Sequence, residues 1–430
     1  MNRLFNPEKK SWSSLIKRPL ISLDSVKNIV DEIFTNVKLY GDKSLIDYTN
    51  KFDKVDLNNL IVCEKKINNS ENEIDNDLKE SINIAFNNIY KFHKNQTFKS
   101  EIIETTAGVY CWQDKRPIEN VGLYIPGGTA PLFSSVLMLA IPAMIANCKN
   151  IVLCSPPNDK GELHPAILYC AKLCKVNKVI SVGGAQSIAA MSIGTESVPK
   201  VNKIFGPGNQ YVTYAKLKSI NFNTAIDMPA GPSELLVLAD ESANPSYIAS
   251  DLLSQAEHGP DSQVIFVSLS RSLINDVEKC INEQIENLNR KNFINKSIAN
   301  SKLIFFDNKI DAVDFINKYA PEHYIVNVEN ESFFIENILS AGSVFIGNYT
   351  PESAGDYASG TNHTLPTNGN AKQYSGVNLD SFLKTITFQK ISKKGLLNIS
   401  KTVETMAESE GLQAHKNAVA IRVKDLNNLK

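Results

Sequence analysis

The chain has 430 residues, and its 45 Lys+Arg against 46 Asp+Glu give a formal net charge of -1. Because nucleic acids and anionic membrane surfaces are bound through an excess of positive charge, this balance argues against both as partners. At about 150 residues per domain, the length predicts two or three compact units with sizeable hydrophobic cores.

The first hundred residues are predicted to be mainly helical. Within 22–105, apolar residues recur at helical spacing, as at Val26, Ile29, Val30 and Ile33, with Asn and Lys on the other faces. The longest apolar run, 132–148, contains two Ser and one Pro and is shorter than the ~20 residues that a membrane span needs. It therefore predicts a buried helix.

From Gly122 onward, short apolar runs alternate with Gly-containing turns and helical patterns. The predicted strands are 151–154, 179–182, 203–205, 235–238, 264–268, 303–306, 324–328 and 344–346. Strands that alternate with helices are typical of parallel, doubly wound sheets. Because these units are too many for one sheet, the sequence predicts two Rossmann-like doubly wound α/β domains.

The C-terminal part has a different pattern. After about Gly376 the alternation stops, and residues 400–423 predict one or two helices with few apolar positions of their own. We expect this segment to pack on another surface, such as a second subunit. The seven Cys are odd in number, form no C-x-x-C motif and lie mostly among apolar residues, which is typical of a reducing compartment. The N-terminus has no apolar segment of a secretory signal.

Four of the six His lie in the second half of the chain, in settings that suit chemistry. His258 follows a predicted helix and shares a helix face with Gln255, His323 follows Glu322, His363 lies in a polar Gly-rich loop that contains Asp356, and His415 lies close to Glu410. Neutral imidazole and carboxylate are ligands that a catalytic Zn²⁺ site uses. The adjacent pair Glu322-His323 offers two bases of different intrinsic pKa. The alternative for that pair is a helix terminus with a capping His.

Three Gly-rich turns follow predicted strands: Tyr124-Ile125-Pro126-Gly127-Gly128, Val182-Gly183-Gly184-Ala185-Gln186 and Phe205-Gly206-Pro207-Gly208-Asn209. None is the G-x-G-x-x-G of a dinucleotide fold or a Walker loop. Their place at the carboxyl ends of parallel strands is where α/β folds bind ligands. Tight turns without a ligand are the alternative.

Together these segments resemble the histidinol dehydrogenase family, the enzymes of the last two steps of histidine biosynthesis. The match runs in order along nearly the whole chain, in blocks 121–131, 183–186, 206–209, 227–234, 251–262, 321–323, 351–366, 374–389 and 408–422. Several blocks exceed ten residues, so the resemblance is more specific than any single motif. It implies a cytoplasmic homodimer that contains one Zn²⁺ per subunit and oxidises L-histidinol to L-histidinal and then to L-histidine with NAD.

The resemblance also implies a role for each site residue. The Zn²⁺ ligands would be Gln255, His258, Asp356 and His415, and the catalytic bases would be Glu322 and His323. Ser233, His363 and Glu410 would contact the substrate together with the ligands and His323, and Tyr124, Gln186 and Asn209 would contact NAD.

The resemblance implies the domain boundaries as well. An N-terminal arm of residues 1–20 would precede a larger α/β domain, 21–121 with 233–377, which carries the zinc and catalytic residues. An NAD-contacting α/β domain, 122–232, would be inserted into it, and residues 378–430 would form a C-terminal dimerisation arm.

The same residues allow two alternative hypotheses about the function. A zinc-dependent hydrolase would use the same ligand set, with Glu322 as the general base for a metal-activated water. A metal-dependent scaffold protein is disfavoured, because a structural zinc site is closed, is usually rich in Cys and does not need the Glu322-His323 pair.

Overall fold

The structure is a computed structural model of the chain, and it describes residues 1–19, 23–97, 99–127, 131–229 and 231–428. Gly128 of the first Gly-rich turn and Ala230 of the 227–234 block lie outside the described residues. The chain divides into two compact units: Met1–Gln96 with Ile118–Phe382, and Thr97–Pro117 with Leu383–Lys430.

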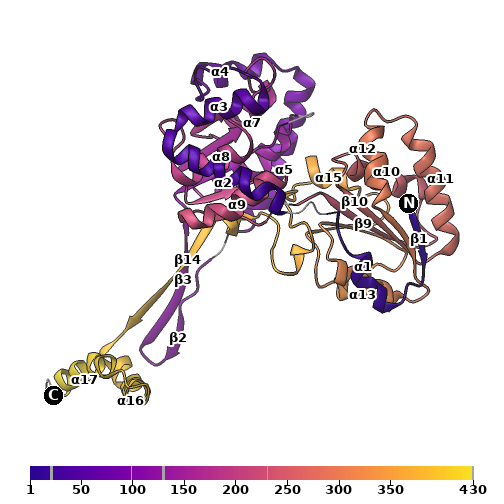
Figure 1. The fold of residues 1–430 in the computed structure, drawn as a ribbon. Coiled ribbons are helices and arrows are strands. Elements are labelled where there is room, and N and C mark those ends of the chain that lie inside the picture. The colour runs from indigo at the N-terminus through magenta and orange to yellow at the C-terminus, as the bar shows by residue number, and fades with distance from the viewer. Residues whose placement is uncertain (20–22, 98, 128–130, 230, 429–430) are drawn as a thin grey trace. The chain divides into compact units, whose positions relative to one another are not determined.

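The first unit contains a six-stranded parallel sheet, in the order β1-β11-β10-β9-β12-β13 (Figure 1). The strands are β1 (Asn2–Phe5), β9 (Glu234–Ala239), β10 (Gln263–Ser268), β11 (Lys302–Phe305), β12 (His323–Asn327) and β13 (Ser343–Ile346). The helices between them include α10 (Pro245–Ala256), α11 (Arg271–Ile285), α12 (Lys291–Ala299), α13 (Lys309–Tyr319), α14 (Ser332–Asn337) and α15 (Glu352–Tyr357).

Alternate residues of β9 show how this sheet is covered on both faces. Leu235 and Val237 belong to one core, with α10 and α11, while Leu236 and Leu238 belong to another, with α13 and the short helix α1 (Trp12–Leu15). Because successive side chains of a strand point to opposite faces, a strand buried on both sides reads as a continuous apolar run. That run is the signal by which β9 was predicted.

The first unit also holds a five-stranded parallel sheet, in the order β6-β5-β4-β7-β8. Its strands are β4 (Asn120–Tyr124), β5 (Asn150–Ser155), β6 (Lys178–Ser181), β7 (Lys203–Phe205) and β8 (Ala225–Ile226). Helices α6 (Phe133–Ile145), α7 (Pro165–Leu173), α8 (Gly184–Ile193) and α9 (Gln210–Ser219) follow its strands. The apolar run 132–148 is thus the buried helix α6, as predicted, and within the described part of the chain no helix has the length and apolar character to cross a membrane.

The predicted N-terminal helical segment consists of α2 (Leu23–Tyr40), α3 (Asp42–Asp53), α4 (Glu64–Asn69) and α5 (Asn76–Lys94). Val30, Phe34 and Leu45 of α2 and α3 share one hydrophobic core with Ile188 of α8 and Val212 of α9. These N-terminal helices therefore pack around the five-stranded sheet, as Figure 1 shows. The domain boundaries given above stay a prediction.

The second unit is an antiparallel sheet, in the order β14-β3-β2, followed by two helices. The elements are β2 (Ile103–Thr106), β3 (Val109–Pro117), β14 (Leu383–Ile391), α16 (Lys393–Ser409) and α17 (Gln413–Asn428). The two predicted helices are present, but the sheet was not predicted. Its long strand β14 has no buried residue, so it lacks the apolar run that marks the parallel strands. Two doubly wound α/β sheets, a helical N-terminal segment and C-terminal helices confirm the predicted fold class.

Candidate active site

Glu322 and His323 stand at the junction between α13 and β12. Helix α13 ends at Tyr319, and Ala320 adopts the left-handed conformation with φ of +54°, so the chain turns before Pro321. Strand β12 begins at His323, which pairs with Leu235 of β9. This turn precedes the amino end of β12, an interior strand of the sheet, and both residues of the pair are buried there, at 6% and 4% exposure.

The imidazole of His323 is oriented by the backbone of β9. Its Nδ1 lies 3.1 Å from the carbonyl oxygen of Glu234. Because a carbonyl oxygen only accepts hydrogen bonds, Nδ1 is the nitrogen that carries a proton. The other nitrogen, Nε2, is buried and has no hydrogen-bond partner in the protein. A buried polar atom left without a partner is a candidate for contact with a ligand.

Glu322 is held by the same residue of β9. Its Oε2 accepts a hydrogen bond of 2.8 Å from the backbone N–H of Glu234. Burial raises the pKa of Glu322 to about 8, although the nearby His323 acts in the opposite direction. A carboxyl group with a pKa this close to neutrality is suited to general acid–base catalysis.

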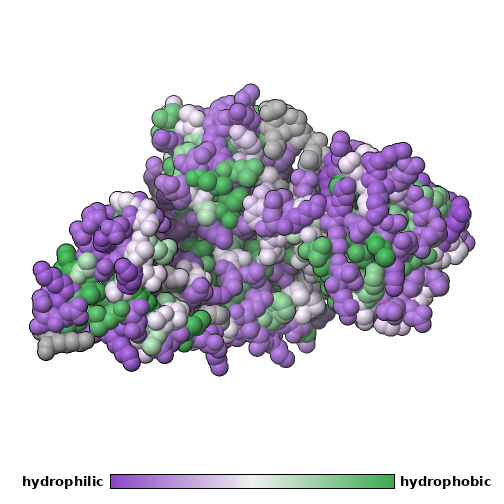
Figure 2. Space-filling model, turned by 90° about the horizontal axis from the view of Figure 1, so that it is seen from below, coloured by the Kyte–Doolittle hydropathy of each residue, from purple (hydrophilic) through white to green (hydrophobic). Residues whose placement is uncertain are grey.

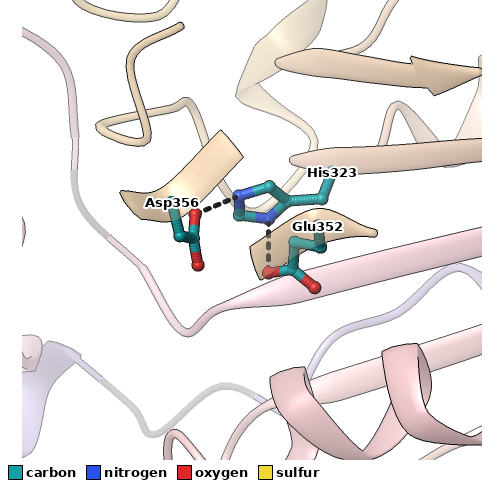
Figure 3. Close-up of side chains that lie close together, drawn as sticks. All are labelled: His323, Glu352 and Asp356. Atoms are coloured by element: carbon teal, nitrogen blue, oxygen red, sulfur yellow. Dashed lines mark ion pairs between the residues drawn. The ribbon is translucent and has the colours of Figure 1, made fainter. Parts of the chain in front are cut away.

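Helix α15 brings two further carboxylates to His323, as Figure 3 shows. Oε1 of Glu352 lies 3.6 Å from Nδ1, and Oδ1 of Asp356 lies 3.7 Å from Nε2. Burial lowers the pKa of His323, but the negative charges of Glu352 and Glu322 outweigh burial and raise it well above the ordinary value. Burial likewise raises the pKa of Asp356, but His323 and His363 outweigh it and lower that pKa.

Sequence reasoning did not single out Glu352, although the structure places it at the centre of the cluster. It is 1% exposed, and its Oε2 has no hydrogen-bond partner. The available signal was the spacing of Glu352 and Asp356 at i, i+4, which puts two acidic side chains on one helix face. His323, Glu352 and Asp356 offer nitrogen and oxygen atoms that all lie within 4.8 Å of one another, a spacing that fits a metal ion.

Gln255 and His258 come from the end of α10, which stops at Ala256 before Gly259 and Pro260. The Gln255 amide lies between Glu352 and Glu234. In the orientation that satisfies both ends, its nitrogen donates to Glu352 Oε1 and its oxygen accepts from the Glu234 N–H at 3.0 Å. Burial lowers the pKa of His258, which favours the neutral imidazole that a metal ion binds.

His363 completes the described part of the cluster. Its Nδ1 lies 3.0 Å from the backbone oxygen of Asp356, and its Nε2 lies 3.1 Å from the hydroxyl oxygen of Ser135. One cavity of about 570 Å³ is lined by all the residues of the first unit that were predicted to bind zinc, to act as bases or to contact the substrate: Ser233, Gln255, His258, Glu322, His323, Asp356 and His363. The structure thus brings these residues together from four separate stretches of the sequence.

The residues present fit a zinc ion at this cavity. Gln255, His258 and Asp356 offer an amide oxygen, a neutral imidazole and a carboxylate, and these are donor types that Zn²⁺ accepts. A zinc ion bound to Asp356 would also place positive charge close to His323, and this charge would lower the pKa of His323. The other two predicted residues, Glu410 and His415, lie in the second unit, after α16 and within α17, and both are exposed there.

The three residues predicted to contact NAD line a second cavity, of about 760 Å³. The hydroxyl oxygen of Tyr124 accepts from the Gly184 N–H at 3.3 Å, and the Asn209 side chain caps α9 by accepting from the N–H groups of Tyr211 and Val212. Gln186 is buried in the first turns of α8. Asn209 and Pro126 line both cavities, so the two cavities adjoin.

The Gly-rich turns have a packing role of their own. A Cβ on Gly127 would come within 2.1 Å of the Pro156 side chain, and a Cβ on Gly208 within 2.3 Å of Val212. Both glycines are therefore required by contacts inside the protein, whatever the cofactor does.

Comparison with known proteins identifies the family. The family model described as histidinol dehydrogenase matches residues 16–423, and the histidinol dehydrogenase of Bacteroides thetaiotaomicron is 54% identical over 420 residues, 98% of each chain. The chain belongs to the histidinol dehydrogenase family. A chloroplastic histidinol dehydrogenase of Arabidopsis thaliana is 50% identical over 99% of this chain and 91% of its own. The crystal structure of histidinol dehydrogenase from Elizabethkingia anophelis has a TM-score of 0.97 at 52% identity, covering 99% of both chains.

Membership of the histidinol dehydrogenase family confirms the predicted family and the predicted class of enzyme, an oxidoreductase. Membership of a dehydrogenase family also argues against the hydrolase alternative. A dehydrogenase must hold a hydride acceptor beside the substrate, whereas a hydrolase needs no such second site. The adjoining cavities that meet at Asn209 and Pro126 suit that requirement.

Proposed function

We propose that this protein oxidises L-histidinol through L-histidinal to L-histidine, with two molecules of NAD⁺ reduced in turn. The observation that carries the proposal is the arrangement of His323 and Glu322 on the wall of one cavity that adjoins a second. One residue presents an unpartnered nitrogen and the other a carboxyl group with a pKa near neutrality. These are the two bases that the two half-reactions need.

In the first half-reaction, Nε2 of His323 takes the hydroxyl proton of the alcohol as a hydride leaves the carbinol carbon. The bond from Nδ1 to the Glu234 carbonyl keeps the imidazole in the tautomer whose Nε2 is free to accept. The product is the aldehyde, with one hydride and one proton removed.

In the second half-reaction, water adds to the aldehyde carbon before a hydride leaves. Glu322 removes a proton from that water when its carboxyl group is ionised. Its Oε2 accepts from the Glu234 N–H, so Oε1 is the oxygen that would take the proton. Loss of the second hydride from the hydrated aldehyde gives the carboxylic acid.

The proposal includes one Zn²⁺ per subunit, held by Gln255, His258, Asp356 and His415. When bound, zinc would serve as a template and Lewis acid that fixes the imidazole and amine of the substrate beside the bases. Ser233, His363 and Glu410 would contact the substrate directly. Tyr124, Gln186 and Asn209 would hold NAD⁺ in the second cavity.

The proposal further includes a homodimer in which Glu410 and His415 reach the active site of the partner. Among the described residues, α17 has no buried residue and α16 only Gly395, Ser400 and Ala407. Met406, Leu412 and Ile421 are exposed, and the two helices, at the left end of Figure 2, carry apolar patches. Such a surface suits burial against a second copy. Location in the cytoplasm stays a prediction.

The experiment that tests the function follows NADH absorbance after histidinol is added to the purified protein. We expect two NADH per histidinol, with histidine as the product, and loss of the reaction in a metal chelator that Zn²⁺ addition reverses. Ester and amide substrates provide the control: hydrolysis without NAD⁺ reduction would support the zinc hydrolase instead. Absence of NADH formation in zinc-loaded protein would refute the proposal.

A further inference from the structure

We infer that Arg18 and Glu234 form a positioning pair that fixes the geometry of both catalytic bases, an inference that rests on the function proposed above. Arg18 touches neither base and lies in the N-terminal segment, 216 residues before Glu234. Its guanidinium joins the two chain segments that meet at the active site. Neither residue was singled out by sequence reasoning.

The first contact is with the start of β9. Nε of Arg18 donates to Oε1 of Glu234 at 3.0 Å, and one terminal nitrogen donates to Oε2 at 2.8 Å. The two side chains are 6% and 0% exposed. A bidentate pair of this kind fixes the orientation of the carboxylate as well as its charge. Oε1 also accepts from the backbone N–H of Asn368 at 2.6 Å, and Asn368 lines the substrate cavity.

The second contact is with the end of α13. The same terminal nitrogen of Arg18 donates to the backbone oxygen of Tyr319 at 2.7 Å, and the guanidinium carbon lies 3.7 Å from the centre of the Tyr319 ring. Tyr319 is the last residue of α13, three positions before Glu322. Arg18 therefore holds the segment that leads into the catalytic pair against the strand that pairs with it.

The backbone of Glu234 turns this contact into catalytic geometry. Its N–H donates to Oε2 of Glu322 and its carbonyl oxygen faces Nδ1 of His323. The backbone of Glu234 thus fixes the position of the Glu322 carboxylate and the tautomer of the His323 imidazole. Arg18 fixes this backbone position by binding the side-chain carboxylate of Glu234.

Because both bases depend on one backbone position, displacement of Glu234 would misplace both, while the substrate and cofactor pockets stay formed. Small errors in the placement of catalytic groups lower the rate of the chemical steps more than binding. The pair is expected to support kcat for both half-reactions.

The test uses the zinc-loaded full-length enzyme with Arg18→Met, Arg18→Lys and Glu234→Gln. We expect Arg18→Met to lower kcat at least tenfold with histidinol and with supplied histidinal, with both KM values within about twofold of wild type. Arg18→Lys, which keeps the positive charge and one donor nitrogen, should recover part of the loss. Arg3→Met is the matched control, because Arg3 also lies in the N-terminal segment and pairs with a glutamate, Glu278, but lines neither cavity.

A double-mutant cycle separates positioning from general weakening. In the Glu322→Gln background, Arg18→Met should cost little further activity in histidinal oxidation, because the base it positions is already absent. Full multiplication of the two losses, a change in KM alone, or an equal effect of Arg3→Met would overturn the inference. Thermal melting and zinc content confirm that each variant is folded and loaded, and Glu234→Gln, which keeps the shape of the side chain, carries the test if Arg18→Met does not fold.

Failure of the proposed function would appear separately. Wild-type enzyme that forms no NADH from histidinol refutes the function, whereas an active wild type with unaffected Arg18 and Glu234 variants refutes only the positioning pair.

Discussion

Nε2 of His323 lies 3.7 Å from Oδ1 of Asp356, farther apart than a hydrogen bond allows. Nε2 therefore has no hydrogen-bond partner among the residues that the structure describes and is available to a ligand in the cavity. His323→Ala should retain zinc and NAD⁺ binding but slow histidinol oxidation by ~10²–10⁴-fold, as loss of a general base does. Stopped-flow NADH formation measures the rate, and elemental analysis measures the metal. Loss of zinc from the His323→Ala variant would instead identify His323 as a zinc ligand.

Glu322→Gln should impair the oxidation of supplied histidinal more than the oxidation of histidinol to the aldehyde. Only the second half-reaction needs a water that has been deprotonated. Glutamine keeps the shape of the side chain, and its amide oxygen can still accept from the Glu234 N–H. The two half-reactions are compared by single-turnover kinetics with each substrate. Equal losses in both would contradict the division of labour between Glu322 and His323.

In the zinc-free protein, the free energy of unfolding should fall as pH rises from 7 to 8. Burial raises the pKa of Glu322 to about 8, and burial also raises that of Glu352 well above its ordinary value, whereas both ionise near 4.5 in the unfolded chain. The folded protein therefore holds protons that unfolding releases. Each such proton lowers the free energy of unfolding by about 1.4 kcal/mol per pH unit. Urea unfolding in chelator measures the slope.

Glu322→Gln serves as the control for this slope, because it removes one of the two titrating carboxyl groups. The slope between pH 7 and 8 should become shallower in that variant. His258 and His363, whose pKa values burial lowers, add stability only as pH rises toward 6.5, so they do not reverse the sign above pH 7. A stability that rises over this interval would show that the carboxyl cluster is ionised in the folded state.

His258→Ala should lose both zinc and activity, since removal of one ligand from a site of mixed nitrogen and oxygen donors weakens metal binding by a factor of at least about 10–100. His164→Asn is the matched control. The side chain of His164 caps α7 by accepting from the Ala166 N–H at 3.2 Å, a role that Asn also fills. The control should keep zinc. If the His258→Ala variant kept stoichiometric zinc and full turnover, His258 would not be a zinc ligand.

Two inactive variants, Glu322→Gln and His415→Ala, should complement each other if the arm completes the partner's site. In a mixed dimer, one site then combines both lesions and the other has neither. A fully exchanged equimolar mixture should recover about a quarter of wild-type activity, because half of the dimers carry one intact site of two. An arm that serves its own chain gives every site one lesion, and mixing would restore nothing.

The sequence by itself predicted eight of the eleven parallel strands that the described residues form, and it assigned no residue range to β1, β4 and β8. Strands buried on both faces leave continuous apolar runs, and β7 was predicted at the bounds the structure gives it, residues 203–205. The sequence did not predict β14, because the apolar residues of that strand are separated by Lys, Thr and Gln and form no continuous run, and none of its residues is buried. The candidate site residues came from a resemblance carried by blocks of sequence, and the structure brings eight of them to one cavity.

What only the tertiary structure decided is how the bases are held. Glu234 reads in sequence as the first residue of a strand, and nothing near it in the chain shows that its backbone binds Glu322, 88 residues away, or that its carboxylate binds Arg18. Glu352 likewise reads as an acidic residue in a short helix. Periodicity is a local property of the chain and survives in the sequence. Contacts across β9, β12 and α15 depend on how those elements pair and pack, which no local pattern records.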